Sequence, residues 1–428
     1  MGEATNQSHR LPPIGYTERM TDADLPLRAA TPDDFAKASA LLFALFHRAI
    51  DKEAQDLDRR VWEADRALVV TDGPDVVGHA VALTRDLTVP GAIIPAAHVT
   101  GVGVAPTHRR RRLLTRLMHR QLRDVRDGGR EALAVLWASE ASIYPRFGYG
   151  LASSRLELTI DTREVSLPAA TAVSRLRAGT PADLLPELTK VYDTLRPDRP
   201  GWSSRDEGGW ANVVADLAVY REGATERRAV VHEGDGGVDG YAMWRTKSGW
   251  TNTGPNAEVQ VNEIAAADPV AYAALWRFLL GIDLARRVTF GFAAVDDPLL
   301  HVVNDPLQLG THYSDGLWVR VVDLPAALAA RRYASGVDVV LEVSDPLFPD
   351  NAGRWRVAGG LGGANCERTD APADLACDIV DVGAAYLGGT SLAALARAGR
   401  VRELRPGTLH PASTAFGWHR LPISPEIF

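Results

Sequence analysis

The sequence predicts a mixed α/β (α+β) protein that folds as three units along 428 residues. Strand-like and helical runs follow one another in residues 25–165, and a weaker version of the same order recurs in residues 166–325. The pattern changes at about residue 326. We therefore expect two related α/β units, then a smaller α+β domain at 326–428, with residues 1–24 as a flexible tail.

Composition narrows the class of protein. Apolar residues make up 46% and charged residues 24% of the chain, as in ordinary globular proteins. The net charge of −7 argues against wholesale binding of nucleic acid, and no apolar run is long enough to span a membrane. The first twenty residues lack the apolar core of a signal peptide, which predicts a cytoplasmic protein. Cys366 and Cys377 alone provide neither a disulfide framework nor a zinc site, and no metal is expected.

The first unit begins with a strand at Leu27 and a helix over "TPDDFAKASALLFALF". Thr31 suits the N-cap of that helix and Pro32 its first position. The runs "RALVVTDG" and "DVVGHAVALTRDLTV" predict two antiparallel strands joined by a turn at Asp72–Asp75. A further strand is expected at "AAHVTGVGV".

A helix is expected from Arg109 to Asp127, because its apolar residues recur on one face: Leu113, Leu114, Leu117, Met118, Leu122 and Val125. Gly128 and Gly129 would stop it. A strand "EALAVLWAS", a turn "SIYPRFGYG" and a strand "RLELTID" follow. The resulting order, β-α-β-β-β-α-β-turn-β, is not that of a doubly wound sheet.

The second unit repeats this order in degenerate form. "GTPADLLPEL" resembles "AATPDDFAKA" of the first unit, and a strand–turn–strand pattern and the helix "DPVAYAALWRFLLGID" come after it. Its strand-to-helix junction, "VNEIAAADPVAYAAL", has no arginine run, so any anion binding at that junction would be lost in the second copy.

Four consecutive arginines, Arg109 to Arg112, join a β-branched run to a leucine-rich helical pattern. A helix N-terminus carries free N–H groups and partial positive charge, so arginines beside it can form a cradle for a pyrophosphate. The preceding strand would offer an exposed edge if it splays from its neighbour. Two alternatives remain open: a solvated basic turn, and, less favoured, a nucleic-acid contact. Only four of the 47 basic residues are lysine, so codon usage accounts for part of the arginine content.

The strings "VGVAPTHRRRRLLTRLM" and "ASIYPRFGYG" resemble the GNAT acetyltransferases, and most closely the Eis-type ("enhanced intracellular survival") N-acetyltransferases of actinobacteria. The resemblance covers nearly the whole chain. It implies a catalytic GNAT domain at 25–165, a degenerate second GNAT domain at 166–325 and a sterol-carrier-like domain at 326–428. The last residues, "PEIF", are similar to the family's C-terminal tail, which returns to the active site. The resemblance also implies a homo-oligomer, a hexamer.

The cosubstrate that the resemblance implies is acetyl-CoA. Its pantetheine arm would follow the strand backbone, its pyrophosphate would meet the loop and helix start, and the residues assigned to it are Val102, Gly103, Val104, Arg109, Arg110, Arg112, Leu113 and Ser139. The family usually has glycine where this chain has Arg112. We expect Arg112 to take an ordinary helical φ, with its side chain turned outward or onto a terminal CoA phosphate.

Two catalytic groups follow from the resemblance. Tyr144 matches the general acid that protonates the CoA thiolate, although a core aromatic beside Phe147 and Tyr149 is the alternative. The base would be the terminal carboxylate of Phe428, with Glu426 as a competing carboxylate. The alternative for this proline-stiffened tail is simple packing on the surface.

The acceptor pocket is expected to be lined by Phe43, Phe46, Trp137 and Glu426. Aromatic walls suit a bulky amine or a sugar face, and polycations would also need acidic groups. His47 and Arg48 stand where a carboxylate would be wanted, so strong activity on aminoglycosides does not follow. We interpret His47, His98 and His119 as surface or capping residues.

The sequence thus predicts an acetyl-CoA-dependent N-acetyltransferase acting on a small-molecule or lysine amine: an aminoglycoside, a polyamine or a lysine side chain. The alternative is a non-catalytic binding protein whose sterol-carrier-like domain holds an apolar ligand. Binding of acetyl-CoA and turnover of an amine would separate the two.

Overall fold

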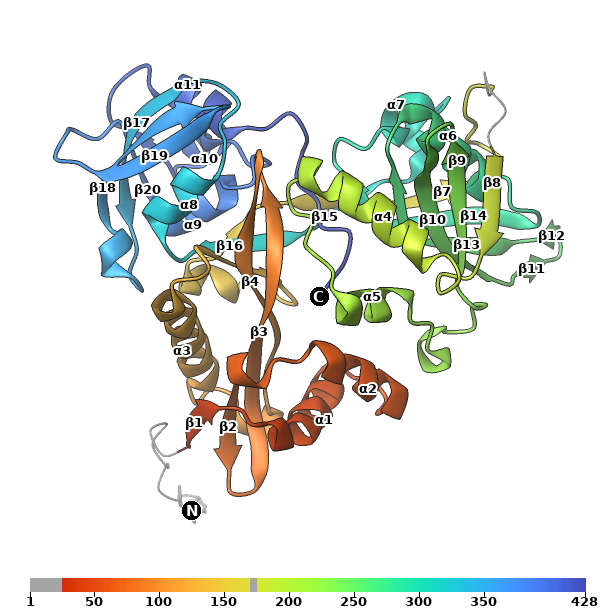
Figure 1. Ribbon diagram of the computed structural model, residues 1–428, viewed down its shortest axis with the longest axis horizontal. Helices are drawn as coiled ribbons and strands as arrows, with labels where there is room; N and C mark the ends of the chain where they lie inside the picture. The colour runs from red at the N-terminus through yellow and green to blue at the C-terminus, as the bar shows by residue number, and fades with distance from the viewer. Residues whose placement is uncertain (1–24, 170–174) are drawn as a thin grey trace, which may run out of the picture.

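The structure, a computed structural model, describes residues 25–169 and 175–428; the tail expected at 1–24 lies outside the described residues. Figure 1 shows three units, each built around a sheet, with the C-terminus lying between the first two units. Within the described residues, no helix is long and apolar enough to cross a membrane.

The first sheet has seven strands in the order β1-β2-β3-β4-β5-β16-β6. Their bounds are β1 Leu27–Ala29, β2 Ala67–Asp72, β3 Asp75–Val89, β4 Ala92–Val104, β5 Leu133–Trp137, β6 Gly150–Leu151 and β16 Leu317–Val321. The predicted hairpin is confirmed, because β2 and β3 pair antiparallel up to Asp72 and Asp75. The sheet is mixed, since β4 and β5 run parallel.

Three helices accompany this sheet: α1 Phe35–Leu45, α2 Lys52–Val61 and α3 Leu113–Gly128. A short 3-10 turn precedes α1, and Thr31 and Asp34 form a capping box there. Helix α2 was not predicted from the sequence, because few of its ten residues are apolar. Asp51 caps α2 by accepting a hydrogen bond from the Ala54 amide at 2.9 Å. The helix packs against the second unit, where a Cβ on Gly208 would lie 3.1 Å from Val61.

The second sheet has the order β15-β7-β14-β13-β10-β9-β8. Its strands are β7 Ser154–Asp161, β8 Arg175–Gly179, β9 Arg228–Gly234, β10 Gly237–Lys247, β13 Ala257–Ala266, β14 Ala285–Ala294 and β15 His312–Asp315, with a small hairpin of β11 Trp250–Thr251 and β12 Gly254–Pro255 beside it. Its helices are α4 Leu185–Leu195, α5 Glu207–Val214, α6 Pro269–Leu280 and α7 Leu299–Val302.

The two large sheets exchange strands. The predicted strand "RLELTID" forms as β7 but pairs with β14 in the second sheet, whereas β16 pairs with β5 and β6 in the first. Strand β7 therefore lies before the expected boundary at 165 but belongs to the second sheet, and β16 lies after that boundary but belongs to the first sheet. Chain order could not reveal this, because β16 meets β5 only after the whole second unit has intervened.

The third unit contains β17 Val337–Ser344, β18 Gly353–Gly360, β19 Gly363–Arg368, β20 Leu375–Asp378 and β21 Arg402–Glu403, with helices α8 Leu324–Ala330, α9 Ile379–Ala385, α10 Leu392–Arg397 and α11 Leu409–Phe416. One hydrophobic core joins it to the first sheet, including Val135 and Val319 on one side and Leu341 and Tyr386 on the other. The contact is close: a Cβ at Gly150 would lie 2.0 Å from the Val380 carbonyl of α9. This packing fixes where the final segment starts.

The segment from Trp418 to Phe428 then runs back along the second unit. The Leu421 amide donates to Asp296 at 2.8 Å, and the Ile423 amide donates to the Pro200 carbonyl at 3.0 Å. Gly201 has a positive φ of 95°, and a Cβ there would lie 2.6 Å from the Ile423 carbonyl oxygen. Only glycine allows this close approach without a shift of the tail.

Candidate functional site

The strand edge expected before the arginine run is present. β4 pairs with β5 at Ala96, Ala97 and His98, and the pairing then ends although β4 continues to Val104. The two strands therefore splay after His98, and the β4 backbone at Val102, Gly103 and Val104 lies on this open stretch. Gly101 interrupts the strand with a positive φ of 58°. The gap leaves backbone groups of β4 free to bind an extended ligand.

The arginine run forms a turn before α3 rather than the first turn of the helix, which begins at Leu113. Arg110 and Arg112 have positive φ values of 64° and 57°. The expectation of a helical φ at Arg112 was wrong, because the chain must make a left-handed turn there to enter the helix. Among the described residues, no side chain caps this helix start. Arg109, Arg110 and Arg112 are exposed, so free N–H groups and guanidinium groups gather at one point.

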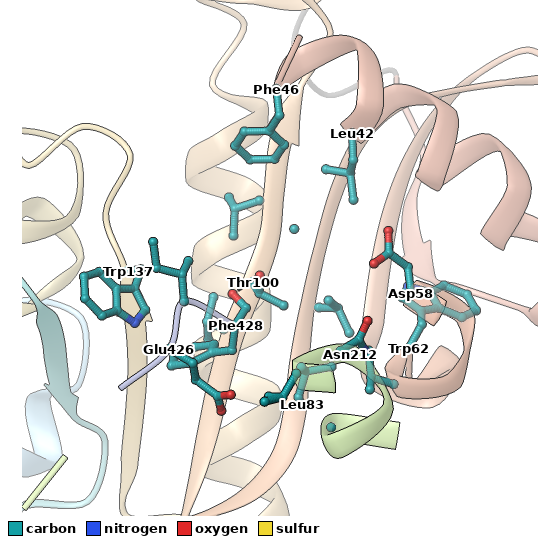
Figure 2. Close-up of a pocket in the computed structure, with 18 of the residues that line it drawn as sticks. Leu42, Phe46, Asp58, Trp62, Leu83, Thr100, Trp137, Asn212, Glu426 and Phe428 are labelled. Atoms are coloured by element: carbon teal, nitrogen blue, oxygen red, sulfur yellow. Dashed lines mark hydrogen bonds between the residues drawn. The ribbon is translucent and has the colours of Figure 1, made fainter. Parts of the chain in front are cut away.

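A cavity of about 830 Å³ lies beside the splayed strands and reaches the C-terminus of the chain. The sequence-predicted residues that line it are Phe43, Phe46, Val102, Trp137, Ser139, Tyr144, Glu426 and Phe428. Gly103, Val104, Arg109, Arg110, Arg112 and Leu113 are outside this lining, further along β4 and at the start of α3. Figure 2 shows Thr100 and Phe428 between Trp137 on one side and Asp58 and Trp62 on the other.

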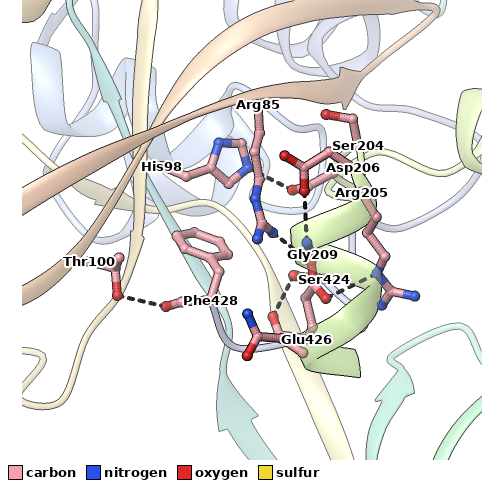
Figure 3. Close-up of polar contacts among 12 residues, drawn as sticks. Arg85, His98, Thr100, Ser204, Arg205, Asp206, Gly209, Ser424, Glu426 and Phe428 are labelled. Atoms are coloured by element: carbon pink, nitrogen blue, oxygen red, sulfur yellow. Dashed lines mark hydrogen bonds and ion pairs between the residues drawn. The ribbon is translucent and has the colours of Figure 1, made fainter. Parts of the chain in front are cut away.

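The last residue of the chain contacts β4. The Thr100 hydroxyl donates a hydrogen bond to the Phe428 carbonyl at 2.8 Å, and the Phe428 ring packs edge-on against His98 with centroids 4.6 Å apart (Figure 3). The end of the third unit thus lies at the splay of the first sheet.

His98 is fully buried, so its interpretation as a surface residue was wrong. Its Nδ1 donates to the Ala96 carbonyl at 2.9 Å, which leaves Nε2 to accept from the Ser203 hydroxyl at 2.7 Å. Burial, with a smaller contribution from the Arg85 charge, lowers the pKa of His98 to about 3. A neutral imidazole with a fixed tautomer therefore supports the Phe428 ring.

Glu426 is held by two arginines (Figure 3). One carboxylate oxygen accepts from Arg85 at 2.9 Å and the other from Arg205 at 3.0 Å. Arg205 also binds Glu263 through both Nη atoms, at 3.0 and 2.6 Å. Glu426 thereby ties the tail to β3 and to the second unit.

Tyr144 begins a short 3-10 turn, Tyr144–Phe147, after β5. Its side chain lines the cavity although the residue is only 6% exposed. Burial, reinforced by the nearby charge of Glu140, raises the pKa of the Tyr144 phenol above its ordinary value. The phenol is therefore protonated at neutral pH and able to donate a proton.

Sequence reasoning missed several cavity residues that come from outside the expected catalytic unit or from α2. Phe292 on β14 packs edge-on against Trp137, with ring centroids 6.1 Å apart. Three acidic side chains also line the cavity: Asp58, Glu263 and Asp315. Alternation along β13 gave no signal for Glu263, because a bulge pairs Glu263 with Met243 but Val261 with Trp244, so Glu263 and Val261 face opposite sides of the sheet. Among the described residues, no three His, Cys, Asp or Glu side chains are grouped as metal ligands.

Comparisons with known proteins agree with this architecture. The pattern of the acetyltransferase (GNAT) domain matches residues 26–152, a second pattern of the same description matches residues 201–321, and that of the sterol carrier protein domain matches residues 324–425. The predicted repeat is therefore confirmed.

Relatives match along nearly the whole chain. N-acetyltransferase Eis of Mycobacterium tuberculosis is 35% identical over 404 residues, covering 91% of this chain and 96% of that protein. An uncharacterised N-acetyltransferase of Streptomyces avermitilis is 46% identical over 379 residues, covering 88% of this chain and 92% of that protein. The crystal structure of Eis1 from Mycobacterium abscessus superposes with a TM-score of 0.81 at 31% identity, covering 94% of this chain and 100% of that one.

The identity to Eis extends through both acetyltransferase domains and the sterol carrier domain, which are the three units of this fold. The chain therefore belongs to the Eis-type family of GNAT N-acetyltransferases.

Proposed function

We propose that this acetyltransferase transfers the acetyl group of acetyl-CoA directly to a primary amine, with Tyr144 as general acid and the Phe428 carboxylate as general base. One observation carries the proposal: the last residue of the chain and Tyr144 line the same cavity, beside the splayed strands of the first sheet.

Acetyl-CoA would lie along β4 and meet the start of α3. The pantetheine arm would hydrogen-bond the backbone at Val102, Gly103 and Val104, and Ser139 would contact the cosubstrate from the end of β5. The uncapped start of α3 at Leu113 supports a pyrophosphate site, because helix N-termini attract anions. Charge-assisted bonds from exposed guanidinium groups would add to it: Arg109, Arg110 and Arg112.

The transfer needs two proton movements. The neutral amine attacks the thioester carbonyl, a C–N bond forms and the C–S bond breaks. The amine's proton passes to the Phe428 carboxylate, which is ionised at neutral pH since free α-carboxyls titrate near pH 3.5. Tyr144 gives its proton to the departing CoA thiolate. The products are an N-acetylated amine and CoA–SH.

Acceptors are expected among small primary amines, including aminoglycosides, polyamines and lysine side chains. Phe43, Phe46 and Trp137 offer aromatic walls, and the cavity also has acidic groups that the sequence analysis did not foresee. Assembly as a homo-oligomer, a hexamer by resemblance, remains a prediction.

A variant extended by one glycine after Phe428 tests the terminal base. The extension converts the Phe428 carboxylate into a neutral amide and moves the free carboxylate one residue away. We expect turnover, measured by thiol release, to fall by about 10²-fold or more, while calorimetry finds unchanged binding of acetyl-CoA. A variant with the same glycine added at the N-terminus is the matched control. Full activity of the C-terminally extended variant would exclude Phe428 as the base.

Glu426→Gln separates the two carboxylates of the tail. Because both oxygens of Glu426 are held by arginines, we expect it to position the tail rather than accept the proton. Loss of turnover in Glu426→Gln, with the glycine-extended protein fully active, would transfer the base role to Glu426. Absence of both acetyl-CoA binding and amine-dependent thiol release would instead favour the alternative of a non-catalytic binding protein for an apolar ligand.

A further inference from the structure

The helix that the sequence analysis missed brings a carboxylate to the cavity. Asp58 on α2 lines the cavity and is half-buried. Figure 2 shows its carboxylate turned toward Leu42 of α1, on the opposite side of Phe428 from Trp137. Asp58 therefore lies away from the entry expected for the thioester.

The other cavity carboxylates already have partners. Glu426 binds Arg85 and Arg205, Glu263 binds Arg205 and accepts from the Tyr241 hydroxyl, and Asp315 accepts from the Trp318 indole at 3.1 Å. Within residues 25–169 and 175–428, the Asp58 side chain forms no hydrogen bond or ion pair.

The charge of Arg48 acts on Asp58, but the two side chains form no ion pair. The Arg48 guanidinium is held over two rings, 5.0 Å from the centroid of Phe43 and 4.6 Å from that of Tyr220. Burial raises the pKa of Asp58, and the charge of Arg48 acts in the opposite sense. A partly desolvated carboxylate without a partner is costly, so a ligand that supplies an ammonium group would be stabilised there.

Apolar side chains accompany Asp58 on this side of the cavity. Leu42, Val61 and Trp62 line this side of the cavity. The Trp62 indole donates to Nε2 of His79 at 3.1 Å, while Nδ1 of His79 donates to the Gly101 carbonyl at 2.7 Å. Burial lowers the pKa of His79 to about 4, so this imidazole is neutral at neutral pH.

Gly101 of β4 packs closely against Leu42 and His79 at this side of the cavity. A Cβ at Gly101 would lie 3.2 Å from Leu42 Cδ1 and 3.2 Å from the His79 ring. An alkyl chain can run between the Phe428 terminus and Asp58, because both residues line the same cavity of about 830 Å³.

We propose that Asp58 binds a second, non-reacting ammonium group of the acceptor, so that the enzyme prefers linear diamines with an apolar linker over monoamines. The inference rests on the proposed function, because the first amine must react at Phe428. The Asp58 contact itself is a charge-assisted hydrogen bond and involves no covalent step.

The test compares hexamethylenediamine with n-hexylamine as acceptors in a thiol-release assay. We expect the wild-type protein to show a kcat/KM at least about tenfold higher for the diamine. Asp58→Asn should abolish that preference, without changing kcat/KM for n-hexylamine or KM for acetyl-CoA. Asp56→Asn is the matched control, because it removes the same charge from the exposed face of α2 and should keep the preference.

The outcomes distinguish the inference from the proposed function. Equal use of the two amines by the wild type, or an equal loss for both in Asp58→Asn, would overturn the inference while amine acetylation stands. Failure of the wild type to acetylate any primary amine would overturn both. If Asp58→Asn does not fold, Asp58→Glu keeps the charge and should keep a preference that Asp58→Ser loses; equal preferences in those two variants would also count against Asp58.

Discussion

Tyr144 and Tyr149 are two buried tyrosines of one segment whose hydroxyls have different surroundings. Tyr144 lines the cavity, whereas the Tyr149 hydroxyl is buried without a hydrogen-bond partner among the described residues. Their rings pack edge-on with centroids 5.9 Å apart. Core packing was the alternative for Tyr144 in the sequence, and in the structure the cavity separates Tyr144 from Tyr149.

Tyr144→Phe should therefore lower kcat by about 10²-fold or more with little change in the affinity for acetyl-CoA, because it deletes a proton donor and little volume. Tyr149→Phe is the matched control and should keep wild-type turnover. Thiol-release kinetics and calorimetric binding of acetyl-CoA measure both effects. Wild-type kcat in Tyr144→Phe would assign this residue to the core.

His98 predicts a pH dependence of stability. Its pKa of about 3 in the folded protein lies below the value near 6.5 expected when unfolded, so the unfolded chain binds a proton that the native protein excludes. Stability from neutral His98 is complete above about pH 6.5 and is lost as the pH falls toward 3. Between about pH 6.5 and about pH 4.5, this loss amounts to about 2 kcal/mol.

His98→Gln cannot bind that proton, so its free energy of unfolding should fall less over the same interval. Urea denaturation of both proteins at the two pH values measures the difference. His79 is present in both proteins and cancels. Parallel losses in the two proteins would show that His98 is not the group responsible.

At the scale of elements, the arginine turn before α3 has a left-handed backbone conformation that its residue types do not indicate. Residue 112 has the left-handed φ that favours glycine, yet the chain has arginine there. An L-residue in this conformation costs on the order of 1 kcal/mol. In our proposal, attraction between the Arg112 charge and the pyrophosphate of acetyl-CoA compensates for this strain.

Two substitutions at residue 112 separate strain from charge. Arg112→Gly should be more stable than Arg112→Ala by about 1 kcal/mol, since both lose the charge and only glycine relieves the strain. Thermal or urea unfolding measures this difference, and both variants should show a raised KM for acetyl-CoA. Equal stability of the two variants would contradict the left-handed turn.

Helix α2 was not predicted from the sequence, although it carries a carboxylate that lines the cavity. Capping residues at Thr31 and Pro32 predicted α1, and the apolar face of α3 predicted that helix. Helix α2 has few apolar residues to mark it, and tertiary contact with the second unit supports it. Asp58 was missed with it.

At the scale of the whole molecule, the catalytic arrangement depends on all three units. The third unit shares a core with the first sheet, the second unit guides the tail, and the tail ends on β4. Gly201 of the second unit lies directly against the backbone of the tail at Ile423.

Gly201→Ala should push the tail away from the cavity, because its Cβ would overlap the Ile423 carbonyl. We expect kcat to fall at least about tenfold, consistent with strain of 1–3 kcal/mol placed on the tail. Gly223→Ala is the matched control: its φ of 85° carries similar strain, but its nearest contact is a lysine side-chain carbon at 3.9 Å. Melting temperatures of both variants are measured as well. Equal kcat in the two variants would show that the position of the tail does not control activity.

The sequence by itself determined the local features of this protein. The β2–β3 hairpin follows from strand alternation and turn residues, the apolar face of α3 from helical spacing, and the family from two motifs and the repeat. These features depend on neighbouring residues, which sequence patterns record directly.

Only the tertiary structure decided which distant residues contact one another. The crossing of β7 and β16 between sheets, the burial of His98 against Phe428, the two arginines on Glu426 and the position of Asp58 all join residues far apart in the chain. No local pattern records such contacts, because they arise when three separately patterned units bury their remaining apolar surface against one another.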